Sequence, residues 1–242
     1  MNPRAVLASR IEFEAPGRRV RLALADAVVT AVAADRPVRV LDAGCGDGLG
    51  TLTLARRHAA WELVGVDIRD DLLEGARARA RARRLENVEF VHADLTQPLP
   101  VDDVDVVLAI ECLTEIPDDG AALAAMAAAL KPGGLLVVHV PERSWTPVLP
   151  GSDATWREEV RHGYTEDELR GALARAGLEP LEVQPTFRVT AVAAQEVRDR
   201  VKGAPLLVRA AMFPAFAAAA ALERRGVTGG RPRALLTVAR RP

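Results

Sequence analysis

The stretch Leu41-Asp42-Ala43-Gly44-Cys45-Gly46-Asp47-Gly48-Leu49-Gly50 decides the fold of this chain of 242 residues. The β-branched run 38–41 enters it as a predicted strand, and a predicted helix over 49–59 leaves it. Glycines permit the positive φ angles of a tight turn and let a ligand approach the backbone, while the N-terminus of the helix faces that ligand. Because ligands of open α/β sheets bind at the carboxyl ends of the strands, this loop predicts a binding site.

The alternation of strands and helices continues along the chain. Strands bounded by helices, four of them nearly uniformly apolar, indicate a parallel sheet that is covered on both faces. Asp70 and Asp118 or Asp119 are expected N-caps, and Thr165 with Glu168 predicts a capping box. The further strands are predicted at 63–66, 88–91, 104–110, 135–140, 181–183 and 235–238, and the further helices at 18–34, 70–84, 118–130 and 165–176.

We therefore expect an α/β fold, a doubly wound and mostly parallel seven-stranded Rossmann-like sheet with a helical insertion before the last strand. A single domain over residues 1–242 is predicted. It divides into an N-terminal arm and helix (1–36), a ligand-binding core (37–186), a helical insertion (187–230) and the last strand (231–242).

Composition excludes several classes of protein. The formal net charge is −1 and aromatic residues make up 4% of the chain, which argues against a surface that wraps or stacks on nucleic acid. The charge is unevenly placed: residues 188–242 carry 11 cations and three acidic residues, a net of +8, which leaves −9 for residues 1–187. Two cysteines build no disulfide framework, and residues 1–14 lack the apolar core of a signal peptide, so a cytoplasmic location is expected.

The glycine spacing narrows the class of ligand. A dinucleotide fingerprint requires G-x-G-x-x-G, but its third position is Leu49 when the count begins at Gly44 and Thr51 when it begins at Gly46. The loop reads D-x-G-x-G-x-G, with Asp42 just before the glycines. A carboxylate there repels a pyrophosphate and suits a cationic or amine-bearing ligand.

This loop and the ends of the later strands resemble the class I S-adenosylmethionine-dependent methyltransferases over roughly residues 38–183. The resemblance implies that S-adenosylmethionine is the cofactor and that the loop with Asp42, Gly44, Gly46 and Gly48 holds its methionine part. The segment Leu130-Lys131-Pro132-Gly133-Gly134 before the fifth strand is also typical of the family.

The ends of the second, third and fourth strands carry the rest of the resemblance. Asp67, nineteen residues after Gly48, matches the acidic residue that binds both ribose hydroxyls, and Ile68 would pack on the adenine. Asp94-Leu95 matches the pair whose carboxylate meets the adenine amino group. Ile110-Glu111 stands where the family contacts the methionine moiety.

Candidates for acid–base chemistry are few. Methyl transfer from a sulfonium is an in-line displacement that needs a general base only when the acceptor arrives protonated. Many relatives read Glu-x-x-Glu-His-Ile after the fourth strand, and Glu115 stands here in place of the His. Glu115 and His162 are the predicted catalytic residues, although His162-Gly163-Tyr164 also fits a loop anchor. His139 reads as a satisfied core histidine.

The sequence thus predicts methyl transfer from S-adenosylmethionine to a small organic acceptor, such as a natural product, a sugar derivative or a lipid-like intermediate. Oxygen or nitrogen is favoured over carbon as the methylated atom. The resemblance places the acceptor under the arm around residues 11–14, the segment 142–164 and the inserted helices. The expected partners are that small molecule and, as an option, a second copy of the chain in a homodimer; no nucleic acid, integral membrane segment or metal ion is expected.

Two alternatives of other classes stay open. The first is an NAD-dependent oxidoreductase, against which the failed third glycine argues. The second is a non-catalytic module with a methyltransferase-like fold, which would bind a membrane surface or a partner through its basic, Ala-rich insertion around residues 203–225.

Overall fold

The computed structural model describes residues 16–34, 36–152, 159–201, 203–224 and 232–242. Its elements are α2 (Pro16–Ala33), β1 (Arg39–Ala43), α3 (Leu49–Arg57), β2 (Glu62–Asp67), α4 (Asp70–Ala82), β3 (Val88–His92), β4 (Val104–Ile110), the short 3₁₀ helix η1 (Leu113–Glu115), α5 (Asp119–Ala129), β5 (Leu130–Pro141), α6 (Glu166–Arg175), β6 (Glu179–Thr186), α7 (Val189–Arg200), α8 (Leu206–Arg224) and β7 (Ala234–Arg240).

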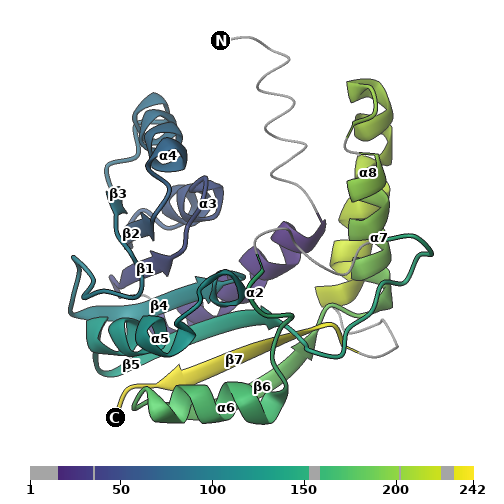
Figure 1. Ribbon diagram of the computed structural model, residues 1–242. Helices are drawn as coiled ribbons and strands as arrows, with labels where there is room; N and C mark the ends of the chain where they lie inside the picture. The colour runs from purple at the N-terminus through teal and green to yellow at the C-terminus, as the bar shows by residue number, and fades with distance from the viewer. Residues whose placement is uncertain (1–15, 35, 153–158, 202, 225–231) are drawn as a thin grey trace.

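Seven strands form one sheet in the order β3-β2-β1-β4-β5-β7-β6 (Figure 1). The five strands from β3 to β5 run parallel, whereas β7 is antiparallel to both β5 and β6. The central strand β4 is buried along six of its seven residues, as expected for a parallel strand covered on both faces. The predicted fold class is confirmed, including the helices that precede the last strand.

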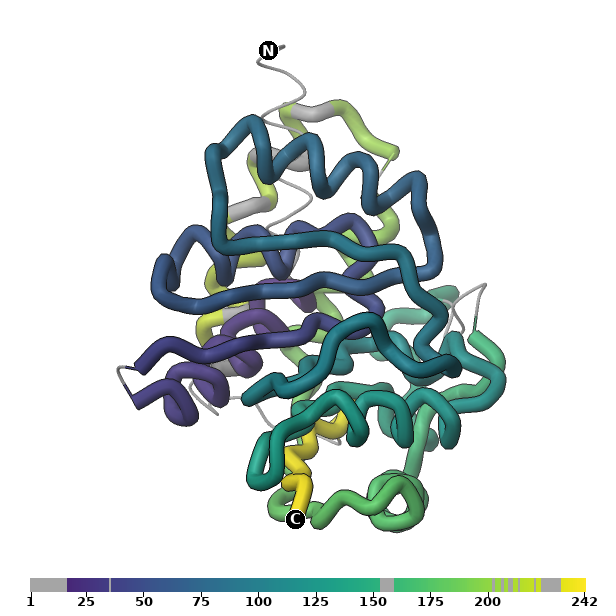
Figure 2. The backbone as a smooth tube through the Cα atoms, turned by 90° about the vertical axis from the view of Figure 1, so that its left-hand side faces the viewer, coloured from purple at the N-terminus to yellow at the C-terminus, as the bar shows by residue number. Residues whose placement is uncertain are grey.

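Helices cover both faces of the sheet. One face packs against α2 and α3, where Val29 and Leu54 join a buried cluster with Val106 of β4. The other face packs against α5 and α6 through Leu123 and Leu169. Figure 2 shows β3, β2 and β1 side by side in this order, with α4 above β3 in the view. Because the chain passes to the other side of the sheet after β4, the carboxyl ends of β1 and β4 border a crevice.

The capping predictions are confirmed at two helices and wrong at one. Asp118 accepts a hydrogen bond from the backbone N–H of Ala121 at 2.8 Å, and Thr165 forms the reciprocal capping box with Glu168. The N-cap of α4 is Arg69, and Asp70 is already helical. The reason lies in Asp67, whose side chain accepts from the backbone N–H of Arg69 and holds the chain extended for one more residue.

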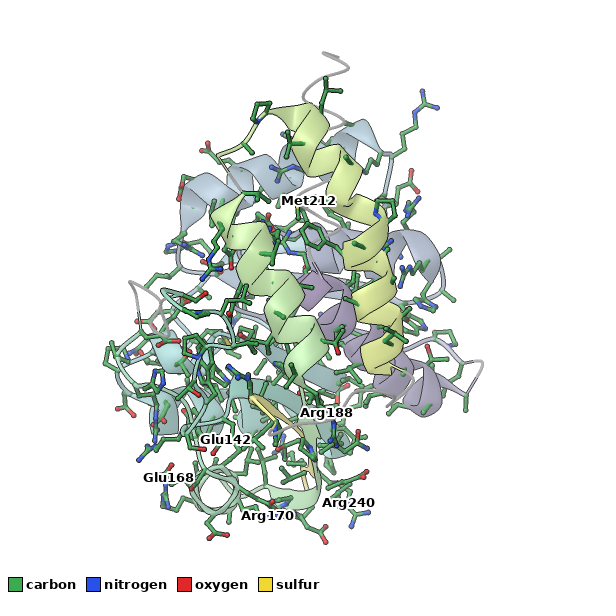
Figure 3. All side chains as sticks on the ribbon, turned by 90° about the vertical axis from the view of Figure 1, so that its right-hand side faces the viewer. Glu142, Glu168, Arg170, Arg188, Met212 and Arg240 are labelled. Carbon is green, nitrogen blue, oxygen red and sulfur yellow. The ribbon has the colours of Figure 1, made fainter. Side chains whose placement is uncertain are left out.

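The inserted segment forms two helices instead of one continuous stretch. α7 and α8 lie side by side with Met212 between them (Figure 3). The separation falls at Pro205, which lacks the N–H that an uninterrupted helix would need there. Both helices also pack against α2. In the part of the chain that the structure describes, no helix is long and apolar enough to cross a membrane.

Candidate active site

A pocket of about 970 Å³ lies at the carboxyl ends of β1, β2, β3 and β4. Its volume is at the upper end of ligand pockets, with room for a cofactor and a second small molecule. Most of the predicted site residues line it, although they come from four separate parts of the chain. These are Asp42, Gly44, Gly46, Asp67, Ile68, Asp94, Leu95, Ile110, Glu111 and Glu115.

The glycine loop is fixed to the end of β2 by its own backbone. The N–H groups of Gly44 and Cys45 both donate to the carbonyl of Val66, at 2.8 and 3.0 Å. Gly44 has a φ of 74°, and a Cβ there would lie 2.5 Å from the Cβ of Cys112. The turn therefore requires glycine for its conformation and for its close approach to the residues after β4.

Gly48 serves a different purpose from the one predicted. Its φ is 67°, and an added Cβ would lie 2.6 Å from both the Cβ of Ala76 and a ring carbon of Phe90. These atoms belong to α4 and β3, and Gly48 is not among the pocket-lining residues. Gly48 thus lets the loop pack against the neighbouring layer, and it does not face the pocket.

Asp67 connects the glycine loop with the end of β2. Its Oδ2 accepts from the N–H of Gly46 at 2.7 Å, and its Oδ1 accepts from the N–H of Arg69 at 2.9 Å. Only 7% of Asp67 is exposed, whereas the next residue, Ile68, is 60% exposed at the pocket wall. A buried carboxylate beside an exposed apolar side chain is suited to hold a ligand that has both hydroxyl groups and a flat ring.

Asp42 carries the most perturbed carboxyl group of the pocket. Burial raises its pKa to about 6, and the nearby charges of Asp67 and Asp47 act in the same direction. The hydroxyl of Thr51 donates to its Oδ2 at 2.6 Å and opposes part of that shift. A carboxylate held in this way gains from a cation that enters the pocket.

The pKa of Asp94 is shifted in the opposite direction to that of Asp42. The backbone N–H and the hydroxyl of Thr96 both donate to its Oδ1, at 2.9 and 2.8 Å, and they hold the pKa of Asp94 below its usual value. Its carboxylate therefore stays ionised at the end of β3, where it can accept a hydrogen bond from a ligand amine.

Neither cysteine of the pocket is set up as a nucleophile. Burial raises the pKa of the thiols of Cys45 and Cys112, and the negative charge of Asp42 raises both further. Since the thiolate is the reactive form, both side chains stay neutral parts of the wall.

Glu111 stands at the end of β4 in an unusual conformation and a polar environment. Its φ is 64°, which side-chain-bearing residues rarely adopt. Its Oε1 lies 2.6 Å from Nδ1 of His139, and its Oε2 lies 3.4 Å from a guanidinium nitrogen of Arg21. Burial alone would raise the pKa of Glu111, but the charge of Arg21 and the hydrogen bond from His139 lower it below its usual value.

His139 itself is the satisfied buried histidine that the sequence predicted. It is 1% exposed, and its second ring nitrogen lies 3.0 Å from the hydroxyl oxygen of Thr186. No motif in the sequence indicates that the partner of its first ring nitrogen is a carboxylate of the pocket.

The helix α2 forms a wall of the pocket that sequence analysis did not assign. It contributes two cations and two apolar residues, and Arg18 pairs with Asp47 of the glycine loop at 3.2 Å. The signal for this face was present in the sequence, because its members recur at spacings of three and four residues. They are Arg18, Arg21, Leu22 and Ala25.

Only part of the expected acceptor cap lies within the described residues. The arm around residues 11–14 lies outside the described residues. Within the described parts of the segment 142–164 and of the inserted helices, no residue lines the pocket. The wall opposite the glycine loop is α2, and α7 and α8 pack behind it.

His162 and Tyr164 lie apart from the pocket lining. The ring of His162 stacks on Trp145, with centroids 5.9 Å apart. Tyr164 is fully buried, and its hydroxyl donates to Asp119 at 2.5 Å while the guanidinium of Arg161 stacks on its ring. These contacts are those of a loop anchor.

Comparison with known proteins agrees with this geometry. Residues 40–134 match a family described as a methyltransferase domain. The chain is 32% identical over 145 residues to a trans-aconitate 2-methyltransferase of Rhodopseudomonas palustris, covering 59% of this chain and 55% of the relative. It is 35% identical over 108 residues to a ubiquinone biosynthesis O-methyltransferase of a Bradyrhizobium species, covering 45% and 42%. The chain thus spans about half the length of the curated relatives it matches.

Solved structures share the fold at lower identity. The [4+2]-cyclase SpnF is 24% identical, with a TM-score of 0.64 over 90% of this chain and 82% of that protein. A SAM-dependent methyltransferase from Aquifex aeolicus is 16% identical, with a TM-score of 0.62 over 97% and 98%. Because one of these neighbours is described as a cyclase, the fold alone does not establish which reaction a member performs.

Proposed function

We propose that this chain, whose residues 40–134 match a methyltransferase domain, transfers a methyl group from S-adenosylmethionine to a small organic acceptor. The observation that supports this most is the set of carboxylates that meet in one pocket. Asp42 and Asp67 lie at the ends of β1 and β2, Asp94 and Glu111 follow β3 and β4, and all four line the same cavity. A sulfonium cofactor with a free amine is a cation at the place where these carboxylates gather.

The residues present fit this cofactor part by part. Asp67 and Ile68 would hold the ribose and adenine, and Asp94 with Leu95 would meet the adenine edge. The loop at Gly44 and Gly46, together with Asp42, would receive the methionine part. When bound, S-adenosylmethionine supplies an electrophilic methyl group on a positively charged sulfur. The protein's own task is to align the acceptor with that methyl group and to keep water away.

The acceptor is proposed to lie between β4 and α2. Leu22 and Ala25 of α2, with Leu54 and Leu108 behind them, give this part of the pocket an apolar lining. Arg18 and Arg21 add two cations at its edge. An oxygen or nitrogen atom of a small organic molecule is the proposed nucleophile, and the names of the relatives include both an organic acid and a quinone precursor pathway as examples of acceptor chemistry.

Of the two predicted acid–base residues, only Glu115 keeps a place in this proposal. It lines the pocket just after β4, so it can reach a bound acceptor. His162 lies outside the lining and is assigned no step.

Equilibrium binding tests the cofactor assignment. Titration calorimetry with S-adenosylhomocysteine should give a dissociation constant in the micromolar range for the wild-type chain. Asp67→Ala should raise this dissociation constant by about 100-fold or more, because two hydrogen-bonded carboxylate oxygens are removed. Asp71→Ala, on the exposed first turn of α4, is the matched control and should leave it unchanged. Equal affinities of the wild type and Asp67→Ala would refute the ribose site, and no binding by the wild type would refute the proposed function.

Release of S-adenosylhomocysteine tests the reaction. The wild type, S-adenosylmethionine and a panel of acceptors with hydroxyl, amine or carboxylate nucleophiles should give product with at least one class. Trans-aconitate serves as the carboxylate probe and a dihydroxybenzene as the hydroxyl probe.

A further inference from the structure

We propose that Glu111 is a catalytic residue at the point of methyl transfer, and that His139 and Thr186 are positioning residues that hold its carboxylate there. This assigns Glu111 a role other than the methionine contact implied by the resemblance. It rests on the proposed function, and it narrows the acceptor to molecules whose nucleophile arrives protonated, such as a hydroxyl group.

The direction of the Glu111 side chain is the first argument. The groups assigned to the cofactor lie on β1, β2 and β3, on one side of β4 in the sheet. The carboxylate of Glu111 contacts His139 of β5, which lies on the other side. The carboxylate of Glu111 therefore lies between His139 of β5 and Arg21 of α2, the helix that lines the proposed acceptor site.

The backbone at Glu111 is the second argument. Its N–H still donates to the carbonyl of His139 at 2.8 Å, so the β4–β5 pairing reaches this residue before the chain turns at a φ of 64°. A side-chain-bearing residue in this region is disfavoured, and such conformations concentrate at functional sites. A glycine would relieve the conformation, but it would also remove the carboxylate.

The hydrogen bonds around His139 assign its tautomer. The pKa of Glu111 is lowered, so its carboxylate is ionised at neutral pH and can only accept. Nδ1 of His139 must then donate to Oε1, and its Nε2 lies 3.0 Å from the hydroxyl oxygen of Thr186. The edge of the Phe187 ring closes the remaining side of the imidazole, with centroids 5.3 Å apart. The imidazole is fixed at both nitrogens, and Oε1 is fixed with it.

The second oxygen of Glu111 remains able to take another donor. Its distance of 3.4 Å from the nearest guanidinium nitrogen of Arg21 is longer than the 2.7–2.9 Å or so of a charge-assisted hydrogen bond. Arg21 also lies over the ring of Phe187, which holds the guanidinium beside the carboxylate without closing on it. Glu111 lines the pocket, and its Oε2 lies on the side of Arg21, whose charge favours the ionised carboxylate.

The proton transfer follows from this placement. As the acceptor oxygen forms its bond to the methyl carbon, the electrons of the S–CH₃ bond go to the sulfur, which becomes a neutral thioether. The proton of the acceptor O–H passes to Oε2 of Glu111, and the neutral carboxyl group returns it to water after product release. His139 keeps its Nδ1 proton throughout. A carboxylate acceptor has no proton to give and would be repelled by Glu111 at this position.

A pair of cofactor analogues tests the placement without knowledge of the natural acceptor. Sinefungin carries a C–NH₃⁺ group where S-adenosylmethionine has its S⁺–CH₃, and S-adenosylhomocysteine has neither. If Oε2 of Glu111 lies at the transfer point, the wild type should bind sinefungin at least about tenfold more tightly than S-adenosylhomocysteine. Glu111→Gln should remove this preference and change the affinity for S-adenosylhomocysteine by less than about twofold. The exposed β3 variant Glu89→Gln is the matched control and should keep the preference. Glu115→Gln changes the other acidic residue that lines the pocket after β4, and it too should keep the preference if Glu111 is the group at the transfer point.

The positioning residues are tested by loss and rescue. His139→Phe removes the donor to Oε1 and should reduce the preference for sinefungin severalfold, and Thr186→Val should do so to a smaller extent. His139→Asn returns a donor near Nδ1 and should restore part of it. A merely structural histidine would change the thermal stability of all these variants and leave the ratio of the two dissociation constants untouched.

The outcomes separate this inference from the proposed function. If Glu111→Gln weakened the binding of sinefungin and of S-adenosylhomocysteine equally, Glu111 would be a contact of the methionine part, and the inference would be overturned. Loss of the preference only in Glu115→Gln would overturn it as well. Failure of the wild type to bind either ligand would overturn the proposed function, and the inference with it. If Glu111→Gln bound S-adenosylhomocysteine tightly and kept the wild-type ratio of the two dissociation constants, the inference would be overturned while the proposed function would stand.

Discussion

The carboxyl group of Asp42 makes stability and cofactor binding depend on pH in opposite directions. Burial raises its folded-state pKa to about 6 from an ordinary value of 3.8. A carboxyl group with a raised folded pKa contributes stability that is fully present below the unfolded value and is lost as the pH rises through the folded value. The loss over the whole window is about 3 kcal/mol, of which about 1.4 kcal/mol falls between pH 5 and pH 8.

Asp42→Asn isolates this contribution. The amide oxygen can still accept from the hydroxyl of Thr51, which lies 2.6 Å from Oδ2, but the group no longer ionises. The free energy of unfolding of the variant relative to the wild type should therefore rise by about 1.4 kcal/mol between pH 5 and pH 8. Urea unfolding at the two pH values measures this double difference, in which the other titrating groups cancel. A relative stability that does not change with pH would refute the assignment of the raised pKa to Asp42.

Cofactor affinity should change with the opposite sign. A cation that binds beside Asp42 requires the ionised carboxylate, which is only about a tenth of the folded protein at pH 5. The wild type should thus bind S-adenosylhomocysteine about tenfold more tightly at pH 7 than at pH 5, and Asp42→Asn should lose that component. Calorimetry at the two pH values would contradict the reasoning if both proteins showed the same change.

Two further predictions concern the packing of the glycine loop and the buried hydroxyl of Tyr164. Gly48→Ala should lower the free energy of unfolding by about 2–5 kcal/mol, since it combines a left-handed conformation with a Cβ only 2.6 Å from Ala76 and Phe90. Gly133→Ala, which has a φ of 78° and no atom within 4 Å of the added Cβ, should lose only about 1–2 kcal/mol; equal losses in denaturant unfolding would show that crowding is not the cause. Tyr164→Phe should cost about 1–3 kcal/mol through the lost hydrogen bond to Asp119, with an unchanged dissociation constant for S-adenosylhomocysteine. A large change in that constant would argue against the anchor role.

Much of the fold could be predicted because its signals are local. The strand over 104–110 is recovered at the predicted residues, since a run that is apolar except for Asp105 favours burial of its side chains on both faces of the sheet. The positive φ angles at Gly44 and Gly46 need glycine, and the capping box at Thr165 is formed by residues three positions apart in the chain. For the same reason the sequence could place Asp42, Asp67 and Asp94 at strand ends, where a parallel sheet brings them to one edge.

Contacts between distant segments decide where two other predicted site residues lie. Gly48 looks like its neighbours Gly44 and Gly46 in the sequence, but only the packing of α4 and β3 shows that it faces away from the pocket. His162 precedes a helix near the expected site, but its stacking on Trp145 holds it elsewhere.

The sequence by itself determined the type of sheet, the loop after β1 and the acidic residues at the strand ends, because periodicity, glycine conformations and capping act over a few residues. The tertiary structure alone decided that α2 forms a wall of the pocket. It also decided that Glu111 contacts His139, which in turn contacts Thr186. Glu111 and His139 are 28 residues apart in the chain, and His139 and Thr186 are 47 residues apart. Only the order of β4, β5, β7 and β6 in the sheet brings these side chains within hydrogen-bond distance. No local rule encodes a contact that depends on how neighbouring strands are ordered in the sheet.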